Sequence, residues 1–176
     1  MELTKRKIFL LILLSIILIG FLLPEKLTIP VANATTEDWN KQTFWYEPWG
    51  NSGVHKGIDI FAAKDTPTFS ATNGIVLYTG FLKYGGNVVV ILGPIWRIHY
   101  YAHLNEIRTS ELSLVGVGEK IGTVGDSGNA KGKAPHLHYS IVSLFPYIWR
   151  VDSTSQGWKK MFYLDPNRKL KDINIQ

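Results

Sequence analysis

A β-prone run, Trp96-Arg97-Ile98-His99-Tyr100-Tyr101-Ala102-His103, lies near the middle of the chain. Aromatic and β-branched side chains are enriched in strands, where successive side chains point to opposite faces of the sheet. A period of two would place His99, Tyr101 and His103 on one face of this strand. The run therefore predicts a β-strand that carries two histidines.

Short β-prone runs continue on both sides of this stretch, separated by glycine, proline and asparagine. Turn signals such as Tyr84-Gly85-Gly86-Asn87 and Asp126-Ser127-Gly128-Asn129 lie between them. Closely spaced strands with turns are typical of all-β proteins, and only the N-terminal region has a long helical pattern. We predict an all-β fold with strands at Gly57–Phe61, Thr68–Thr72, Gly74–Tyr78, Asn87–Leu92, Trp96–His103, Lys120–Val124 and His136–Val142.

Composition excludes several classes of site in this chain of 176 residues. The absence of cysteine excludes thiol catalysis, disulfides, cysteine zinc fingers and lipid attachment through cysteine. The formal charge is +5, and residues 1–34 contain four of the 19 basic and two of the 14 acidic residues. No basic run longer than two residues follows them, so we expect no nucleic-acid surface.

The N-terminus has the layout of a secretory signal. Lys5-Arg6-Lys7 precedes an uncharged apolar run over residues 8–23, and Ala32-Asn33-Ala34 follows it. A basic start, an apolar core and small residues at an A-x-A site are typical of a signal peptide that is cut after the second alanine. Because the spacer before that site is long, a retained signal anchor is the alternative.

Both interpretations send residues 35–176 across a membrane. We therefore expect an exported protein that works in the periplasm, the cell envelope or the medium. Contact with the membrane is expected only through residues 8–23, in a chain that is not cut.

Two motifs offer metal-ligating side chains. His55-Lys56-Gly57-Ile58-Asp59 brings a histidine and a carboxylate together, and Gly57 permits the chain to bend between them. His136-Leu137-His138 puts two imidazoles on one face of a strand. Each motif alone also occurs as solvated surface residues. Their combination in one small β domain favours a site built from His55, Asp59 and one histidine of the pair.

Two imidazoles and one carboxylate with an open water position are the ligand set of a catalytic zinc site. The other histidine of the pair and His103 are expected beside that water, as a base or as a stabiliser of the oxyanion. His99 would lie about 13 Å from His103 along the strand, too far to share the metal. We interpret His99 as a hydrogen-bonded or solvent-facing residue.

Further sequence blocks accompany these motifs in a fixed order. The blocks are His55–Asp59, Ser70–Val76, Tyr101–Leu104, Gly118–Gly125, Pro135–Tyr139 and Tyr163–Pro166. Together they resemble the LytM/lysostaphin-like zinc peptidases, family M23, over the region from about Val54 to Pro166.

The resemblance implies antiparallel β-sheets around a narrow substrate groove, the duplicated hybrid motif fold. It implies one zinc ion per chain, bound by His55, Asp59 and His138. His136 and His103 match the two catalytic histidines of the family that do not bind the metal. The implied activity is endopeptidase cleavage of peptides in bacterial peptidoglycan.

The chain departs from the family pattern in several places. Ser140 replaces the acidic residue that usually follows the two histidines of the strand. The loop Tyr46–Asn51 lacks the usual FG-x-R pattern, and Tyr46 is the candidate for the tyrosine that stabilises the transition state in the family. Residues 144–161 are an insertion outside the common core, which we expect to shape the substrate groove.

A zinc endopeptidase is favoured because all the ligand and catalytic positions are filled. The alternative is a non-catalytic LytM-like module that activates a cell-wall amidase, and a third hypothesis is an unrelated zinc esterase or carboxypeptidase. We expect a monomer whose partners are peptidoglycan peptides. The expected organisation is a signal peptide or anchor (1–34), an aromatic loop segment (35–53), the peptidase-like domain (54–166) and a C-terminal tail (167–176).

Overall fold

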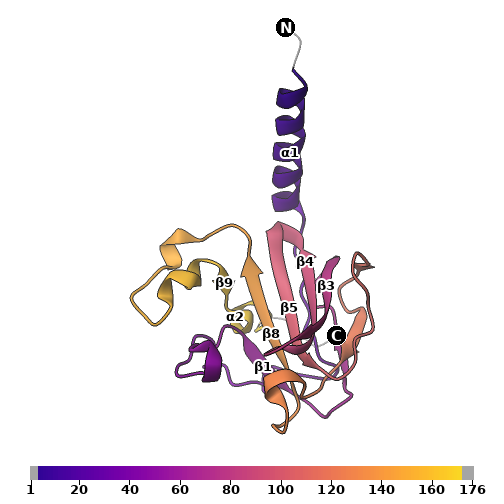
Figure 1. Cartoon of the computed structure of the whole chain (residues 1–176), viewed down its shortest axis with the longest axis vertical. Coiled ribbons are helices and arrows are strands. Elements are labelled where there is room, and N and C mark those ends of the chain that lie inside the picture. Colours follow the sequence, from indigo (N-terminus) through magenta and orange to yellow (C-terminus); the bar gives the residue numbers. More distant parts are fainter. Residues whose placement is uncertain (1–3, 172–176) are drawn as a thin grey trace.

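The computed structural model describes residues 4–171. Its strands are β1 (Ile58–Phe61), β2 (Pro67–Phe69), β3 (Gly74–Leu82), β4 (Gly86–Gly93), β5 (Arg97–Leu104), β6 (Leu114–Val115), β7 (Lys120–Thr123), β8 (His136–Ser143) and β9 (Tyr163–Leu164). Within this part of the chain, one sheet has seven strands in the order β1-β8-β5-β4-β3-β6, and β9 pairs with β8 (Figure 1). A smaller sheet pairs β2 with β7. All of these pairs are antiparallel, which confirms the predicted all-β fold.

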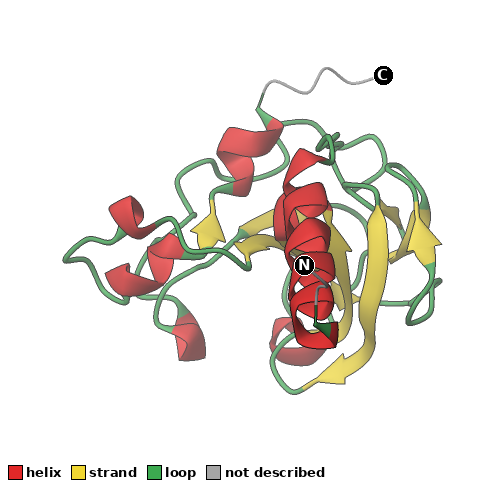
Figure 2. Cartoon of the chain, turned by 90° about the horizontal axis from the view of Figure 1, so that it is seen from above, coloured by secondary structure: helices red, strands yellow, loops and turns green. Residues whose placement is uncertain are grey.

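Two α-helices flank the sheets, α1 (Lys5–Leu22) and α2 (Pro166–Leu170). The 3-10 helices are η1 (Gly50–Ser52), η2 (Pro94–Trp96), η3 (Gly128–Ala130), η4 (Ile148–Arg150) and η5 (Gly157–Met161). Helix α1 projects from one end of the β domain, and Figure 2 looks down onto it from that end. No helix within residues 4–171 combines the length and the apolar character needed to cross a membrane.

The alternation of side chains along the central strands separates the core from a cleft. Leu137, Tyr139 and Ile141 of β8 are buried in the hydrophobic core. Burial of one such large side chain contributes about 1.5–3 kcal/mol to folding. His136 and His138, on the opposite face of the same strand, line the cleft. The predicted common orientation of these two histidines is therefore confirmed.

Strand β5 breaks its alternation at the end that reaches the cleft. His103 has a φ of +64°, a left-handed conformation that L-residues other than glycine rarely adopt. It lines the cleft together with Tyr100 and Ala102, whereas His99 and Tyr101 are fully buried on the core side. The prediction that His103 shares a strand face with His99 and Tyr101 is therefore wrong, because the backbone reverses the expected orientation.

Candidate active site and metal centre

The pairing of β1 with β8 brings the two metal-binding motifs together. Asp59 of β1 lies directly opposite His138 of β8 in the antiparallel register. Just before β1, the backbone at Gly57 passes so close to β8 that a Cβ atom there would lie 2.4 Å from the carbonyl oxygen of Tyr139. Glycine is therefore required for the close approach that leads the chain back to His55.

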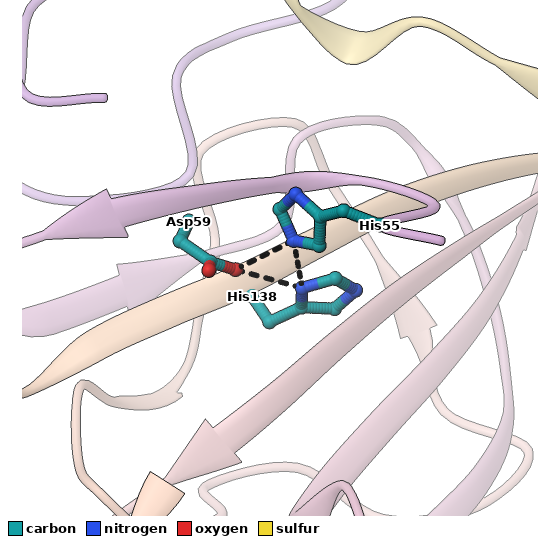
Figure 3. A group of neighbouring side chains, drawn as sticks. All are labelled: His55, Asp59 and His138. Carbon is teal, nitrogen blue, oxygen red and sulfur yellow. Dashed lines mark hydrogen bonds and ion pairs between the residues drawn. The ribbon is translucent and has the colours of Figure 1, made fainter. Parts of the chain in front are cut away.

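Three ligand atoms converge at this point, as Figure 3 shows. His55 Nε2 lies 3.1 Å from Asp59 Oδ1 and 3.1 Å from His138 Nδ1, and these last two atoms lie 2.8 Å apart. Ligand atoms of a tetrahedral zinc ion, with bonds of about 2.0–2.1 Å, lie about 3.3 Å apart. The triangle is therefore close to the size that such an ion requires.

The outer hydrogen bonds of the two rings orient the inner nitrogen atoms as metal ligands. The Nδ1–H of His55 donates to the carbonyl oxygen of Thr43 at 3.1 Å, so Nε2 of the neutral ring carries a lone pair. Nε2 of His138 lies 3.0 Å from Ser140 Oγ, and donation there leaves a lone pair on Nδ1. Two lone pairs and a carboxylate that face one another need a cation, so the residues fit zinc.

The carboxylate of Asp59 is charged despite its burial. Burial raises its pKa, but hydrogen bonds with His138 and His55 would outweigh this effect and hold the pKa well below the usual range, so any proton shared in this group lies on a ring nitrogen and not on the carboxylate. Asp59 therefore supplies the anionic ligand at neutral pH. In the described residues, His55, Asp59 and His138 form the one group of this kind whose ligand atoms lie within 4.8 Å of one another.

His136 and His103 lie beside this group. Each ring makes its hydrogen bond to the backbone through Nδ1 and not through Nε2. The Nδ1–H of His136 donates to the carbonyl oxygen of Ala134 at 2.8 Å, and that of His103 donates to Ser127 at 2.9 Å. The two rings meet edge to face with centroids 5.0 Å apart. The pKa of His103 is lowered to about 4, mainly by burial and to a smaller extent by the neighbouring rings of His138 and His136. This ring is therefore neutral at pH 7.

A cleft of about 750 Å³ opens over these residues. Its lining includes the three ligands, His103, His136 and aromatic side chains from several loops and strands, namely Trp49, Tyr84, Tyr100 and Tyr163. Trp49 stacks on the ring of His55, with centroids 4.1 Å apart and an interplanar angle of 23°. The structure therefore adds Trp49 and the Thr43 carbonyl to the site, two contacts for which the sequence carries no recognisable spacing.

Neither Tyr46 nor the insertion 144–161 contributes to the lining of the cleft. Tyr46 is 54% exposed and packs edge to face on Trp49. The insertion 144–161 contacts the loop whose residues Trp49 and Ser52 line the cleft. Its Gln156 Nε2 donates to the carbonyl oxygen of Ser52 at 2.8 Å, and Trp45 Nε1 donates to the carbonyl oxygen of Ser155 at 3.1 Å.

His99 has a structural environment that agrees with its interpretation as a hydrogen-bonded residue. It is fully buried, and its Nδ1 lies 2.7 Å from the hydroxyl oxygen of Tyr139. It faces away from the cleft and has no part in the metal-binding group.

Similar proteins are peptidases with related sequences and folds. The chain is 36% identical over 115 residues to the L-Ala–D-Glu endopeptidase of Bacillus subtilis, which covers 59% of this chain and 35% of that protein. It is 34% identical over 88 residues to the peptidoglycan DD-endopeptidase ShyA of Vibrio cholerae, covering 50% of this chain and 20% of that protein. The chain thus spans about a third or less of the length of these relatives.

A solved structure shares the arrangement of the strands. The catalytic domain of the antimicrobial peptidase lysostaphin from Staphylococcus simulans matches with a TM-score of 0.57 and 28% identity, over 71% of this chain and 86% of that domain. The sequence model of peptidase family M23 matches residues 53–147, a segment that contains the ligands on β1 and β8 and both further histidines of the cleft. With the fold, the site and the sequence in agreement, the chain belongs to peptidase family M23.

Proposed function

We propose that this protein is a zinc-dependent endopeptidase that hydrolyses peptide bonds in bacterial peptidoglycan. The observation that carries the proposal is the convergence of His55 Nε2, Asp59 Oδ1 and His138 Nδ1 at distances of 2.8–3.1 Å, beside two further histidines in an open cleft. Two relatives support the substrate class, since one is named an L-Ala–D-Glu endopeptidase and the other a peptidoglycan DD-endopeptidase.

Zinc bound by His55, Asp59 and His138 would act as a Lewis acid and lower the pKa of a water molecule. The chain's own contribution comes from the two other histidines. In each, the Nδ1–H is held by a backbone carbonyl, so the Nε2 atom of the neutral ring can accept a proton. One ring takes the proton of the attacking water at Nε2. It returns this proton to the nitrogen atom of the breaking peptide bond, which leaves as the amine. The second ring, which stays neutral, accepts a hydrogen bond from the attacking water at Nε2 and orients it.

The aromatic walls of the cleft hold an extended peptide near these nitrogens. Tyr100 and Tyr163 contribute hydroxyl groups whose pKa values burial raises, to about 12 for Tyr100, so both remain protonated hydrogen-bond donors at neutral pH. Trp49 excludes water from one side of His55 by stacking on it. We propose that the protein performs this reaction outside the cytoplasm, because its substrate lies there and its N-terminus has the layout of an export signal.

The test is digestion of purified, intact peptidoglycan, with mass spectrometry of the released fragments. We expect new α-amino ends from a cut peptide bond, and none from the His136→Ala variant. Release only when a separate cell-wall amidase is added would favour the non-catalytic module. No new ends under either condition would overturn the proposal.

A further inference from the structure

The segment between α1 and the predicted cleavage site is built into the β domain. Thr28 N–H donates to the carbonyl oxygen of Ala71 at 2.9 Å, and Ala32 N–H donates to that of Pro67 at 3.0 Å. In return, Phe69 N–H donates to the carbonyl oxygen of Pro30 at 2.9 Å, so the segment runs beside β2 like an additional strand. Its side chains Ile29 and Val31 are buried in the core.

A buried ion pair fixes the start of the same segment. Glu25 accepts a hydrogen bond from Arg97 of β5, and both side chains are only 9% exposed. Lys169 of α2 approaches the same carboxylate at 3.4 Å. Loss of one partner from a buried ion pair leaves an uncompensated charge in the protein interior. A cut after Ala34 would remove Glu25 and these backbone contacts from the domain.

Helix α1 is held in one orientation on the domain. The indole of Trp96 lies so close to Gly20 that a Cβ atom there would come within 2.4 Å of it, and its Nε1–H donates to the carbonyl oxygen of Ile17 at 2.9 Å. Phe21 packs against Phe145 with ring centroids 4.8 Å apart. The helix is thus docked at its C-terminal end rather than tethered by a free linker.

The rest of α1 has no protein partner that covers its apolar side chains. Large apolar residues are exposed on all sides of the helix, from Ile8 to Leu22, with values of 41–80% apart from the partly covered Ile17. The basic residues Lys5, Arg6 and Lys7 lie at the far end. Apolar side chains with a basic cluster at one end match a lipid surface with anionic headgroups.

A second apolar patch lies on the end of the domain from which α1 projects. Figure 1 shows the chain after β8, in orange, leaving the sheet near the base of α1 and running to the side, away from the helix. Ile148 and Trp149 of η4 are 69% and 76% exposed, and Leu144 beside Phe145 is 48% exposed. Tryptophan and other aromatic residues are enriched where proteins meet the interface of a bilayer.

We propose that α1 stays attached to the domain and that α1, together with the patch Leu144, Phe145, Ile148 and Trp149, forms a surface that binds a bilayer of anionic phospholipid. Apolar side chains of α1 enter the acyl region of the leaflet that faces the domain, the patch rests at the interface of that leaflet, and the basic triplet adds attraction to the anionic headgroups. This holds the β domain with its cleft at the membrane surface. The proposal is independent of peptidase activity.

The first test uses the absence of cysteine, which allows single-cysteine variants of the full chain to carry an environment-sensitive dye. Ile148→Cys places the dye in the patch. Phe81→Cys is the matched control, since Phe81 is likewise well exposed, at 65%. It lies near the β3–β4 turn, whereas α1 lies at the opposite end of this hairpin, beside Gly74. The vesicles contain phosphatidylglycerol and phosphatidylethanolamine.

With vesicles we expect a blue shift and a several-fold brighter emission of the dye on Ile148→Cys, and no change on Phe81→Cys. An unchanged emission from Ile148→Cys, or equal changes at both positions, would overturn the lipid-binding patch. N-terminal sequencing of the protein isolated from producing cells is the second test. We expect no chain that begins at Thr35, and finding such a chain as the main folded species would overturn the retention of α1.

Discussion

At the candidate metal centre, each histidine that we propose as a ligand is oriented by a hydrogen bond on the opposite edge of its ring. For His55 that partner is a backbone carbonyl, Thr43, which no side-chain substitution removes. For His138 it is the hydroxyl of Ser140, at 3.0 Å. Ser140 is thus a positioning residue, and it is the position at which this chain differs from the acidic residue common in the family.

The Ser140→Ala variant tests this role. Loss of the hydroxyl frees His138 to rotate or change tautomer, and loss of such an outer partner typically weakens metal binding about 10–100-fold. We expect the zinc dissociation constant to rise by that factor, measured by competition with a chelator. Ser140→Thr, which keeps the hydroxyl, should stay close to the parent protein. An unchanged zinc affinity in Ser140→Ala would contradict the positioning role.

Ligands and catalysts should respond differently to removal of the imidazole. We expect His138→Ala to lose zinc, because three protein ligands leave no spare. His136→Ala and His103→Ala should keep zinc and the fold but lose about 10²–10⁴-fold in kcat. Zinc content by atomic absorption and turnover on the same samples make the comparison. A zinc-free His136→Ala beside a zinc-loaded His138→Ala would exchange the two roles.

Among the strands in residues 4–171, those of three residues or more could be predicted from the sequence, although β3 extends to Leu82 and not only to Tyr78, and the two-residue strands could not. Strands β5 and β8 have aromatic and β-branched residues with a period of two, so their positions were predicted within a residue or two. Strands β6 and β9 contain two residues each, and the segment beside β2 pairs through backbone groups alone. Such pairing depends on distant neighbours rather than on local residue types.

The candidate site shows the same division. The presence of both motifs in one small β domain predicted that His55 and Asp59 combine with the histidine pair, and the pairing of β1 with β8 brings them together. The orientation of His103 could not be predicted, since it depends on one positive φ at the end of a strand. Trp49 lies in a loop without a period, so its stacking on His55 depends on tertiary packing.

The segment from Glu25 to Ala34 should contribute to stability as an element of the domain. Glu25→Ala would leave Arg97 buried without its partner, at a cost of about 3–5 kcal/mol. We expect urea denaturation to show a loss of this size. Glu37→Ala is the control, because Glu37 pairs with Lys41 on the surface and should change the midpoint little. Equal effects of the two substitutions would contradict the structural role of the segment.

For the molecule as a whole, stability should fall in mild acid because of a buried histidine. Burial, followed by the charges of Arg97 and Lys169, lowers the pKa of His99 to about 3. A histidine in the unfolded chain has a pKa near 6.5. Below that pH the unfolded state therefore binds a proton at this residue and the folded state does not. This contribution to stability is complete above pH 6.5 and declines as the pH falls towards 3, by about 1.4 kcal/mol per pH unit.

Urea denaturation of metal-free protein at pH 7 and pH 5 measures this effect. We expect His99→Gln, which cannot titrate, to lose about 2 kcal/mol less than the parent protein between these two pH values. A parallel decline in both proteins would assign the acid sensitivity to other groups. Because His99 is fully buried, its replacement also changes the core, and only the pH dependence reports on its charge.

The proposed peptidase reaction requires a zinc ion held by His55, Asp59 and His138. The most direct measurement is the release of α-amino groups from purified peptidoglycan by metal-depleted protein, as zinc is added back in steps. We expect no release without metal and a rise that reaches its plateau at one zinc per chain, with no recovery in Asp59→Ala. Full release by the metal-depleted protein, or a zinc-loaded protein that cuts no peptide bond, would contradict zinc-dependent peptide hydrolysis by this protein.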